Sequence, residues 1–373
     1  MDQAVETAVE RDEFAAPPPL YFKGRYSAVG LDIGSEQLKL IQFKQEHGEV
    51  FLHQYGIYDL PEGAITAGRV TDAAALSDRL AWVFKRRRFH RNRVNLCIGS
   101  QAVILRQMRL PKMPPRELQA ALRFEAGKEI MIPLEEAVLD YIEIGESVVD
   151  GNEVIDLAVV AAPKDVVNDY ITVILKAGLY PDVIEIEPFA LQRVLPYVVP
   201  NLVPVSRGEE AEALMVLDIG GECSNLLLVD QGGFSFSRTL SIGVNHFCHR
   251  IAERREIGYD AARRLLFGGD PFTVEGVQEV ADELVNQIRR SLEFYLYRAG
   301  HAQKEIKTIC LCGGGASIDR LPSFLGFELK VEPKILNPFS FVHIGRRFIR
   351  EDLEREGHLL NIASGLALRG WLR

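Results

Sequence analysis

The sequence predicts an α/β protein built from two related halves. Residues 29–35 (VGLDIGS) and 216–221 (VLDIGG) each join an apolar run to an aspartate and a glycine turn. This pattern is typical of a buried strand that enters a hairpin, whose tip exposes backbone N–H groups beside a carboxylate. A third glycine turn, at 313–315, follows the apolar run 309–312. Three such turns in this order predict two facing halves around a cleft suited to phosphate and magnesium.

The order of the turns resembles that of the actin-like ATPases, in which two lobes enclose a nucleotide. In those proteins the glycines of the third turn let the backbone approach the nucleoside. The predicted fold class is therefore an α/β, actin-like ATPase fold, with two lobes around a nucleotide cleft and an α+β subdomain inserted in the first lobe.

Composition excludes several other classes of protein. The chain has 373 residues, 47% apolar and 25% charged, which is typical of a globular protein with two or more compact units. No run approaches the roughly 18 to 20 apolar residues that span a bilayer, and no signal peptide opens the chain. A cytoplasmic location is expected. The net charge of −9 argues against binding to nucleic acid.

The first half is expected over residues 23–200. Residues 1–22, which precede it, are acidic and rich in alanine and proline, so they are predicted to be a disordered tail. After the tail, apolar periodicity predicts three strands, at 28–31, 38–43 and 50–55. A helix at 72–85 and a fourth strand at 94–98 are predicted to follow them.

An inserted block is predicted at about 100–178, where the pattern becomes strand, helix, strand, strand, helix. Pro111, Pro114 and Pro115 separate its first strand from its first helix, at 116–128. Its last helix, 163–177, ends at Gly178, a residue suited to a left-handed C-cap.

The second half is predicted over residues 212–373, after a linker at 201–211. It opens with the strand 213–218 and closes with a helix around 361–369. Between them, helical patterns predict a subdomain at about 246–305.

One basic run interrupts the acidic chain. Residues 85–93 carry six cations at the end of the helix predicted at 72–85. Two interpretations remain open: a solvated helix C-terminus whose cations complement the helix dipole, or a patch that faces anionic lipid or an acidic partner.

Several further segments resemble one family. They are LPKMP at 110–114, EIMIPLEE at 129–136, AAPKDVV at 161–167, EPFAL at 187–191 and GLALRG at 365–370. Together they resemble PilM, the actin-like component of type IV pilus assembly, and more distantly FtsA. The resemblance covers residues 27–370.

The resemblance implies a cytosolic adaptor at the inner-membrane platform. The implied partner is the N-terminal tail of a PilN-type membrane protein, held in a groove beside the inserted block, with the exposed surface of 103–145 as the partner site. Contact with the pilus motor ATPases is also implied, and attachment to the membrane would be peripheral, through partners. Two alternatives stay open: an FtsA-like filament-forming protein and a small-molecule kinase of the same superfamily.

The resemblance also implies ATP and Mg²⁺ as cofactors. Asp32 and Asp218 would hold Mg²⁺ through water, and Glu187 would orient an attacking water. The residues expected to bind the nucleotide are Asp32, Gly34, Ser35, Glu36, Gln37, Lys39, Asp218, Gly220, Gly221, Gly313, Gly314 and Gly315.

The departures from the family pattern weaken this expectation. Glu36 and Glu222 stand where small hydroxyl residues are usual, and each carboxylate near a triphosphate costs on the order of 1–3 kcal/mol. Arg263 and Leu266 replace a glutamate and a lysine that contact the nucleoside. Weak or lost ATP binding is therefore expected, with at most slow hydrolysis, and the chain is interpreted as a non-enzymatic assembly protein.

Overall fold

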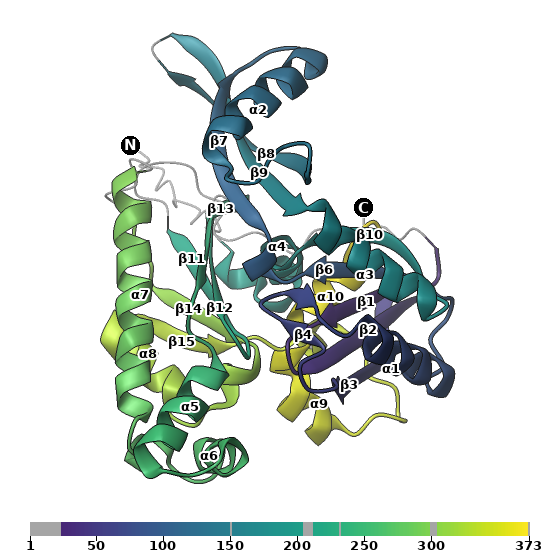
Figure 1. Cartoon of the computed structure of the whole chain (residues 1–373), viewed down its shortest axis with the longest axis vertical. Coiled ribbons are helices and arrows are strands. Elements are labelled where there is room, and N and C mark those ends of the chain that lie inside the picture. The colour runs from purple at the N-terminus through teal and green to yellow at the C-terminus, as the bar shows by residue number, and fades with distance from the viewer. Residues whose placement is uncertain (1–23, 150, 204–211, 231–232, 299–303, 372–373) are drawn as a thin grey trace, which may run out of the picture.

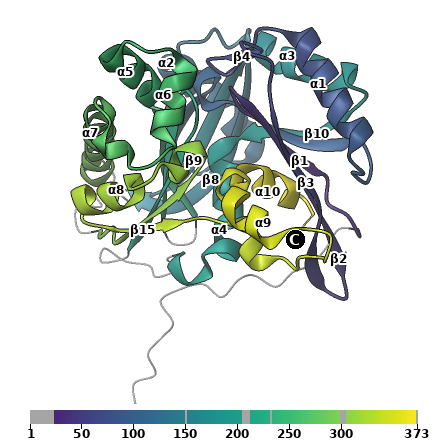
Figure 2. The ribbon, with the colours of Figure 1, turned by 90° about the horizontal axis from the view of Figure 1, so that it is seen from below.

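The computed structural model describes residues 24–149, 151–203, 212–230, 233–298 and 304–371. The predicted tail at 1–22 and most of the predicted linker lie outside these residues. Figure 1 shows two lobes side by side, with a smaller sheet and helix α2 (Pro115–Glu129) rising above the middle of the molecule. Seen from below in Figure 2, the C-terminal helices α9 (Arg350–Glu356) and α10 (Asn361–Leu368) lie beside the strands β1 (Val29–Ile33), β2 (Gln37–Glu46) and β3 (Glu49–Asp59).

The first lobe is a five-stranded sheet covered on both faces by helices. Its order is β10-β6-β1-β2-β3, formed by Tyr180–Ile186, Arg93–Ile98, Val29–Ile33, Gln37–Glu46 and Glu49–Asp59. One face packs on α1 (Ala73–Arg86) and α3 (Lys164–Lys176). The other packs on α4 (Glu187–Val198) and α10 (Asn361–Leu368). A small hairpin of β4 (Ile65–Thr66) and β5 (Arg69–Val70) completes the lobe.

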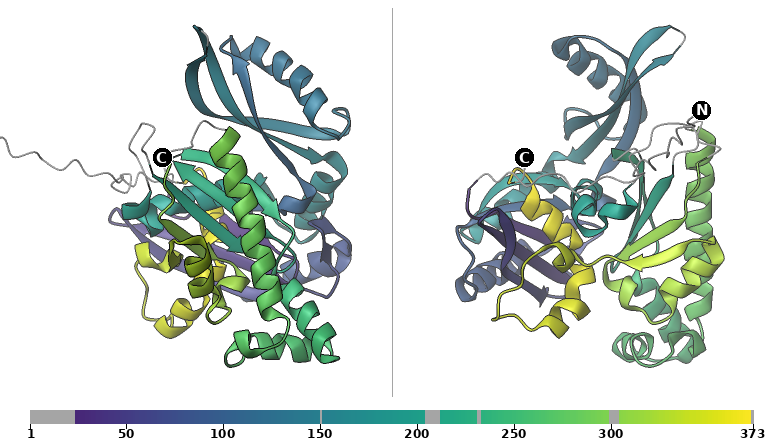
Figure 3. Two further views of the ribbon diagram at one scale, coloured as in Figure 1. Left: turned by 90° about the vertical axis from the view of Figure 1, so that its left-hand side faces the viewer. Right: turned by 180° about the vertical axis from the view of Figure 1, so that it is seen from behind.

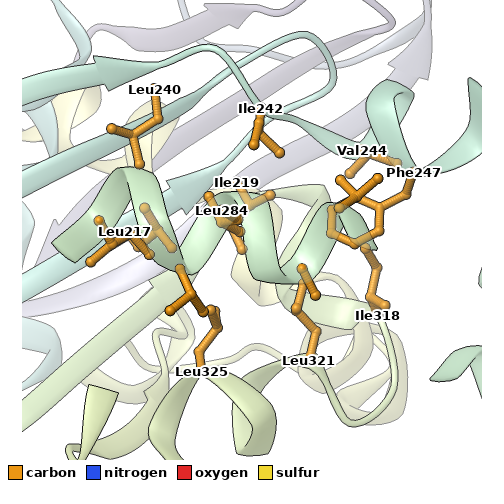
Figure 4. Close-up of a cluster of buried hydrophobic side chains, with 14 of the residues drawn as sticks. Leu217, Ile219, Leu240, Ile242, Val244, Phe247, Leu284, Ile318, Leu321 and Leu325 are labelled. Atoms are coloured by element: carbon orange, nitrogen blue, oxygen red, sulfur yellow. The ribbon is translucent and has the colours of Figure 1, made fainter. Parts of the chain in front are cut away.

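The second lobe repeats this plan. Its sheet order is β13-β12-β11-β14-β15, formed by Gly233–Leu240, Ser224–Asp230, Ala213–Ile219, Thr308–Cys312 and Glu332–Ile335. Its helices are α5 (Val244–Arg255), α6 (Tyr259–Leu266), α7 (Val277–Arg298) and α8 (Leu321–Leu329). Figure 4 shows the core between the sheet and these helices, where Leu217 and Ile219 of β11 lie near Leu284 of α7. The continuous apolar runs of the central strands follow from burial on both faces.

The duplication extends to strand direction. In each lobe the central strand, β1 or β11, pairs antiparallel with the next strand along the chain and parallel with a much later one. The register places Asp32 opposite Lys39 in the first lobe and Asp218 opposite Asn225 in the second. The two aspartates therefore occupy equivalent places at the ends of equivalent strands.

The inserted block is smaller than the sequence predicts. It consists of a three-stranded sheet, β7-β9-β8 (Ile104–Pro111, Asn152–Pro163, Ala137–Val149), and helix α2 (Pro115–Glu129). Leu118 and Leu122 of α2 pack on Leu157 of β9. Helix α3, which we expected to close this block, instead buries Tyr170 and Val173 against the first lobe. An apolar helix face joins the larger core available to it.

The C-terminal segment also lies elsewhere than the predicted second half. After the short helical turn Pro338–Phe341 and α9 (Arg350–Glu356), helix α10 packs between β1 and α4 of the first lobe. Glycines permit this close fit: a Cβ at Gly30 would lie 1.8 Å from the Ala363 carbonyl oxygen, and one at Gly365 would lie 1.8 Å from that of Ala190. The chain thus crosses back to the first lobe, as the rear view in Figure 3 shows.

Among the described residues, no helix combines the length and apolar character needed to cross a membrane.

Candidate functional site

A cavity of about 120 Å³ lies between the two lobes, where the glycine turns meet. The β1–β2 and β11–β12 hairpins form its sides, and the turn after β14 forms another wall. In both hairpins the first glycine closes the turn: the Gly34 N–H donates to the Gln37 carbonyl, and the Gly220 N–H to the Cys223 carbonyl, each at 3.0 Å. The repeated sequence has therefore folded into a repeated turn.

Two glycines bring the turns into close contact. A Cβ at Gly221 would lie 2.7 Å from the Ser35 hydroxyl oxygen of the opposite lobe. Gly313 has a φ of 76°, and a Cβ there would lie 2.4 Å from an Asp218 carboxylate oxygen. Larger residues at these positions would push the loops apart.

Three carboxylates surround one ammonium group in the cavity. The Lys39 Nζ lies 3.0 Å from Asp32 Oδ2, and both side chains are largely buried. Burial alone would lower the pKa of Lys39, but the attraction of Asp32, Asp218 and Glu187 outweighs it and raises the pKa. Lys39 therefore stays charged and points into the cavity, although its place on a strand was equally compatible with solvent. A formal charge of −2 remains on the ionised cluster.

Asp218 is the less compensated aspartate. Burial raises its pKa to about 6, against the opposing effect of Lys39. The Cys312 thiol donates a hydrogen bond to Asp218 Oδ1, at 3.5 Å. A thiol is a weak hydrogen-bond donor, so a bound cation would stabilise the ionised form of this carboxylate.

Glu187 is the first residue of α4, and its carboxylate enters the same cavity. The Asn225 amide donates a hydrogen bond to Glu187 Oε2. One oxygen of Asp32, one of Glu187 and the Cys97 sulfur all lie within 4.8 Å of one another. Burial raises the pKa of the Cys97 thiol, so the two carboxylates are the better ligands for a hard cation such as Mg²⁺.

Glu36 and Glu222, the two unexpected acids, both bridge the lobes. Glu36 Oε2 lies 2.9 Å from the Arg263 guanidinium of α6, and the Tyr259 hydroxyl donates to Glu36 Oε1 at 3.1 Å. Glu222 accepts from the Ala67 backbone N–H at 2.9 Å. Glu36 and Arg263, which in the sequence are separate departures from the family pattern, form one ion pair in the structure.

Most of the residues expected at the cleft line the cavity. Gly315 does not: a Cβ there would lie 2.2 Å from an Ile219 methyl carbon, so this glycine serves packing. Gln37 lines the cavity, and its amide donates to Asp59 Oδ1 at 3.3 Å. Other lining residues belong to no glycine motif and were not predicted from the sequence, among them Gln101, Asn225, Phe267, His358 and Asn361.

A second cavity, of about 160 Å³, lies where the inserted sheet meets the first lobe. Strand β8 is an edge strand, and its Val138 and Ile142 side chains are 43% and 36% exposed. Ile184 and Phe189 of the first lobe lie across from them. This partner groove, as we call it, is lined by Ile98, Val103, Val138, Asp140, Tyr141, Ile142, Val160, Ala162, Val167, Ile184, Glu185, Ile186, Phe189 and Arg369.

Two lobes of one topology, facing each other across paired aspartate–glycine turns, define the actin-like ATPase fold. The sequence profile of the family described as "Type IV pilus assembly protein PilM" matches residues 30–371, so the chain belongs to the PilM family.

Solved structures support the same fold and family. A chain of a structure titled "PilM-PilN type IV pilus biogenesis complex" is 30% identical, with a TM-score of 0.82 over 93% of this chain and 99% of that chain. The ethanolamine utilization protein EutJ from Carboxydothermus hydrogenoformans is 14% identical, with a TM-score of 0.53 over 96% of this chain and 93% of that chain. At that identity EutJ supports the fold alone. The predicted fold class and family are confirmed.

Proposed function

We propose that this chain is a cytoplasmic adaptor of type IV pilus assembly, placed at the inner membrane by binding the N-terminal tail of a PilN-type protein. Family membership supports this role, and so does the likeness to a chain from a PilM–PilN complex. The partner groove carries the proposal within the structure, because it places an open strand edge beside exposed apolar side chains.

The groove suits an extended peptide. An added strand would hydrogen-bond to the free edge of β8, while alternate side chains would enter the apolar floor. Val138 and Ile142 are four positions apart on one strand, so they share a face and would contact tail residues that are also four positions apart. Asp140 lies between them on the same face and offers a carboxylate to a basic tail residue.

One end of the groove is polar and linked by hydrogen bonds. The Glu185 carboxylate accepts from Arg193 Nη2 at 2.9 Å and from Arg369 Nη1 at 2.8 Å. The Arg193 guanidinium also donates to the Gly365 carbonyl at 3.0 Å, which ties the network to α10. This network holds Arg369 at the groove wall, where it can bind a tail carboxylate or carbonyl.

Peptide titration tests the adaptor proposal. The N-terminal peptide of a PilN-type protein is titrated into the full chain by calorimetry. Val138→Glu/Ile142→Glu should weaken binding at least about tenfold, because each change buries a charge in an apolar contact. Val148→Glu, on the same strand but outside the groove and 68% exposed, is the matched control. Equal affinities for the two variants, or no binding of the wild type at high micromolar peptide, would refute the groove as the binding site.

We also propose that the cleft binds Mg–ATP weakly. The phosphate side fits: two turns offer backbone N–H groups, and the carboxylate cluster carries more negative charge than Lys39 balances. Asp32 and Asp218 would hold Mg²⁺ through water, which would neutralise phosphate oxygens, and Glu187 is placed to orient a water. Arg263 and Phe267 already line the other side of the cavity, so the nucleoside would have to displace the Glu36–Arg263 pair.

The two sites adjoin along the chain. Glu185 and Ile186 line the partner groove, while Glu187, the next residue, lines the cleft. We therefore expect a change at one site to shift the wall of the other, and coupling of this kind is reciprocal. Peptide affinity measured with and without a non-hydrolysable ATP analogue and Mg²⁺ should differ severalfold; identical affinities at saturating nucleotide would exclude coupling.

A further inference from the structure

The C-terminal end of α1 carries an exposed basic cluster that the adaptor role does not use. We define it as Lys85, Arg86, Arg87, Arg88 and Arg91, all exposed. Within the described part of the chain, none of these five forms an ion pair with a carboxylate. Arg86 instead stacks over the Trp82 ring at 4.5 Å and Arg87 over the Tyr58 ring at 5.5 Å. In a chain with a net charge of −9, this is a concentrated positive surface.

Cations from other elements extend the cluster around His53. This side chain contacts the Arg88 carbonyl at 3.2 Å. Burial lowers the pKa of His53, and the positive charges of Arg347, Lys44 and His90 lower it further. Two acids beside neighbouring cations are already paired, Glu46 with Arg25 and Lys44, and Asp182 with Arg93. The surface therefore lacks a full set of counter-charges.

The described chain begins inside this basic surface. The Tyr26 ring stacks on His90 with centroids 3.9 Å apart and meets His53 edge-on at 4.9 Å. Residue 26 also bridges to Lys44 of β2. The point at which residues 1–23 join the described chain therefore lies next to the cluster.

The tethered segment has the opposite charge. Residues 1–22 contain five acids and a single basic residue, Arg11. The acid nearest to the fold is Glu13, and the eleven residues from there to Gly24 span at most about 40 Å when extended. The acids are Asp2, Glu6, Glu10, Asp12 and Glu13.

We propose that the acidic segment 1–22 docks on the basic cluster of its own chain and covers it. A single exposed ion pair contributes only about 0.2–1 kcal/mol, so one pair would not hold the segment. Several pairs act together here, and tethering raises the local concentration of the segment to the millimolar range. The segment then screens the cluster from other anionic surfaces.

A competition experiment in the full chain tests this proposal. A variant with a neutral tail carries Asp2→Asn, Glu6→Gln, Glu10→Gln, Asp12→Asn and Glu13→Gln. A fluorescent peptide of residues 1–22 should bind this variant at least about tenfold more tightly than the wild type, whose own segment occupies the cluster. Binding should weaken as salt rises from 0.02 to about 0.3 M, because the contacts are exposed ion pairs.

Matched triple variants locate the site. In the neutral-tail background, Arg86→Gln/Arg88→Gln/Arg91→Gln should weaken peptide binding at least about fivefold. Arg255→Gln/Arg264→Gln/Arg290→Gln removes the same charge from exposed positions on the second lobe and should change it less than about twofold.

Three outcomes overturn the proposal. They are equal peptide affinity for the wild type and the neutral-tail variant, equal losses in the two triple variants, and equal binding of wild type and neutral-tail chains to phosphatidylglycerol vesicles. The last result would show that the cluster is open to lipid in the wild type.

Discussion

The two lobes share one topology but treat their aspartates differently. Asp32 faces Lys39 across the hairpin, and the ammonium lies 3.0 Å from the carboxylate. Asp218 faces Asn225, whose amide turns to Glu187 instead. The residue opposite Asp32 is a cation and the residue opposite Asp218 is an amide, so Asp32 is held in an ion pair, whereas burial raises the pKa of Asp218 against the opposing effect of Lys39. The two lobes share a backbone topology, but the residue opposite the aspartate differs, Lys39 in one lobe and Asn225 in the other, and this difference makes the site asymmetric.

A second difference lies two residues before each aspartate. The first lobe has Gly30, on which α10 rests, whereas the second has Val216, buried in an apolar cluster. The lobes differ because only one of them receives the C-terminal helix. The difference between glycine and valine at this position thus reflects which element packs on each sheet.

Removing the Lys39 ammonium from the cavity should have the largest effect on stability. Lys39→Met leaves the buried carboxylates without their ammonium, and we expect the free energy of unfolding to fall by about 3–5 kcal/mol. Urea denaturation at pH 7.5 without Mg²⁺ measures it. Lys44→Met, on the same strand but in a more exposed pair with Glu46, should cost less than about 1 kcal/mol. Similar losses would mean that Lys39 does not balance the cluster.

A larger residue beneath α10 should cause the next largest loss of stability. Gly30→Ala places a methyl group against the Ala363 carbonyl, and overpacking of this kind costs about 3 kcal/mol. Gly345→Ala, with no atom within 4 Å of its Cβ, should change stability by less than about 0.5 kcal/mol. Thermal or urea unfolding compares them, and a Gly30→Ala variant as stable as the wild type would contradict the packing of α10.

Neutralising the aspartates should change stability in opposite directions. The folded-state pKa of Asp218, about 6, exceeds its ordinary value of 3.8, so its contribution to stability is present below pH 4 and is lost as pH rises through 6. Asp218→Asn should therefore stabilise the nucleotide-free chain by about 1–3 kcal/mol at pH 7.5, with the gain vanishing near pH 4. Asp32→Asn should destabilise it, because Lys39 loses its partner. Urea titrations at both pH values would show whether the signs are opposite.

The smallest effect concerns the bridging acids. Glu36→Gln removes the charge that holds Arg263, and we expect Mg–ATP affinity to rise about tenfold, since a carboxylate no longer faces the triphosphate. Glu222→Gln should gain less, because its carboxylate is held by the Ala67 N–H. Calorimetry with a non-hydrolysable analogue measures both, with the exposed Glu354→Gln as control. An unchanged affinity would show that Glu36 does not obstruct the site.

Local patterns were sufficient for much of the fold. The helix predicted at 72–85 corresponds to α1, and the one at 116–128 to α2, because apolar spacing and flanking prolines act over a few residues. The aspartate–glycine turns were found for the same reason. His358 and Asn361 were missed at the cleft because they reach it on a segment that returns from the second lobe.

The sequence by itself determined the two halves, their turns and the charge of each loop, since these depend on neighbours along the chain. Tertiary structure decided which charges meet. Glu36 and Arg263 became one ion pair only when the lobes faced each other, and α3 and α10 joined the first lobe because its sheet had two apolar faces to cover. Contacts between residues far apart in sequence depend on how surfaces fit, and no local pattern encodes that fit.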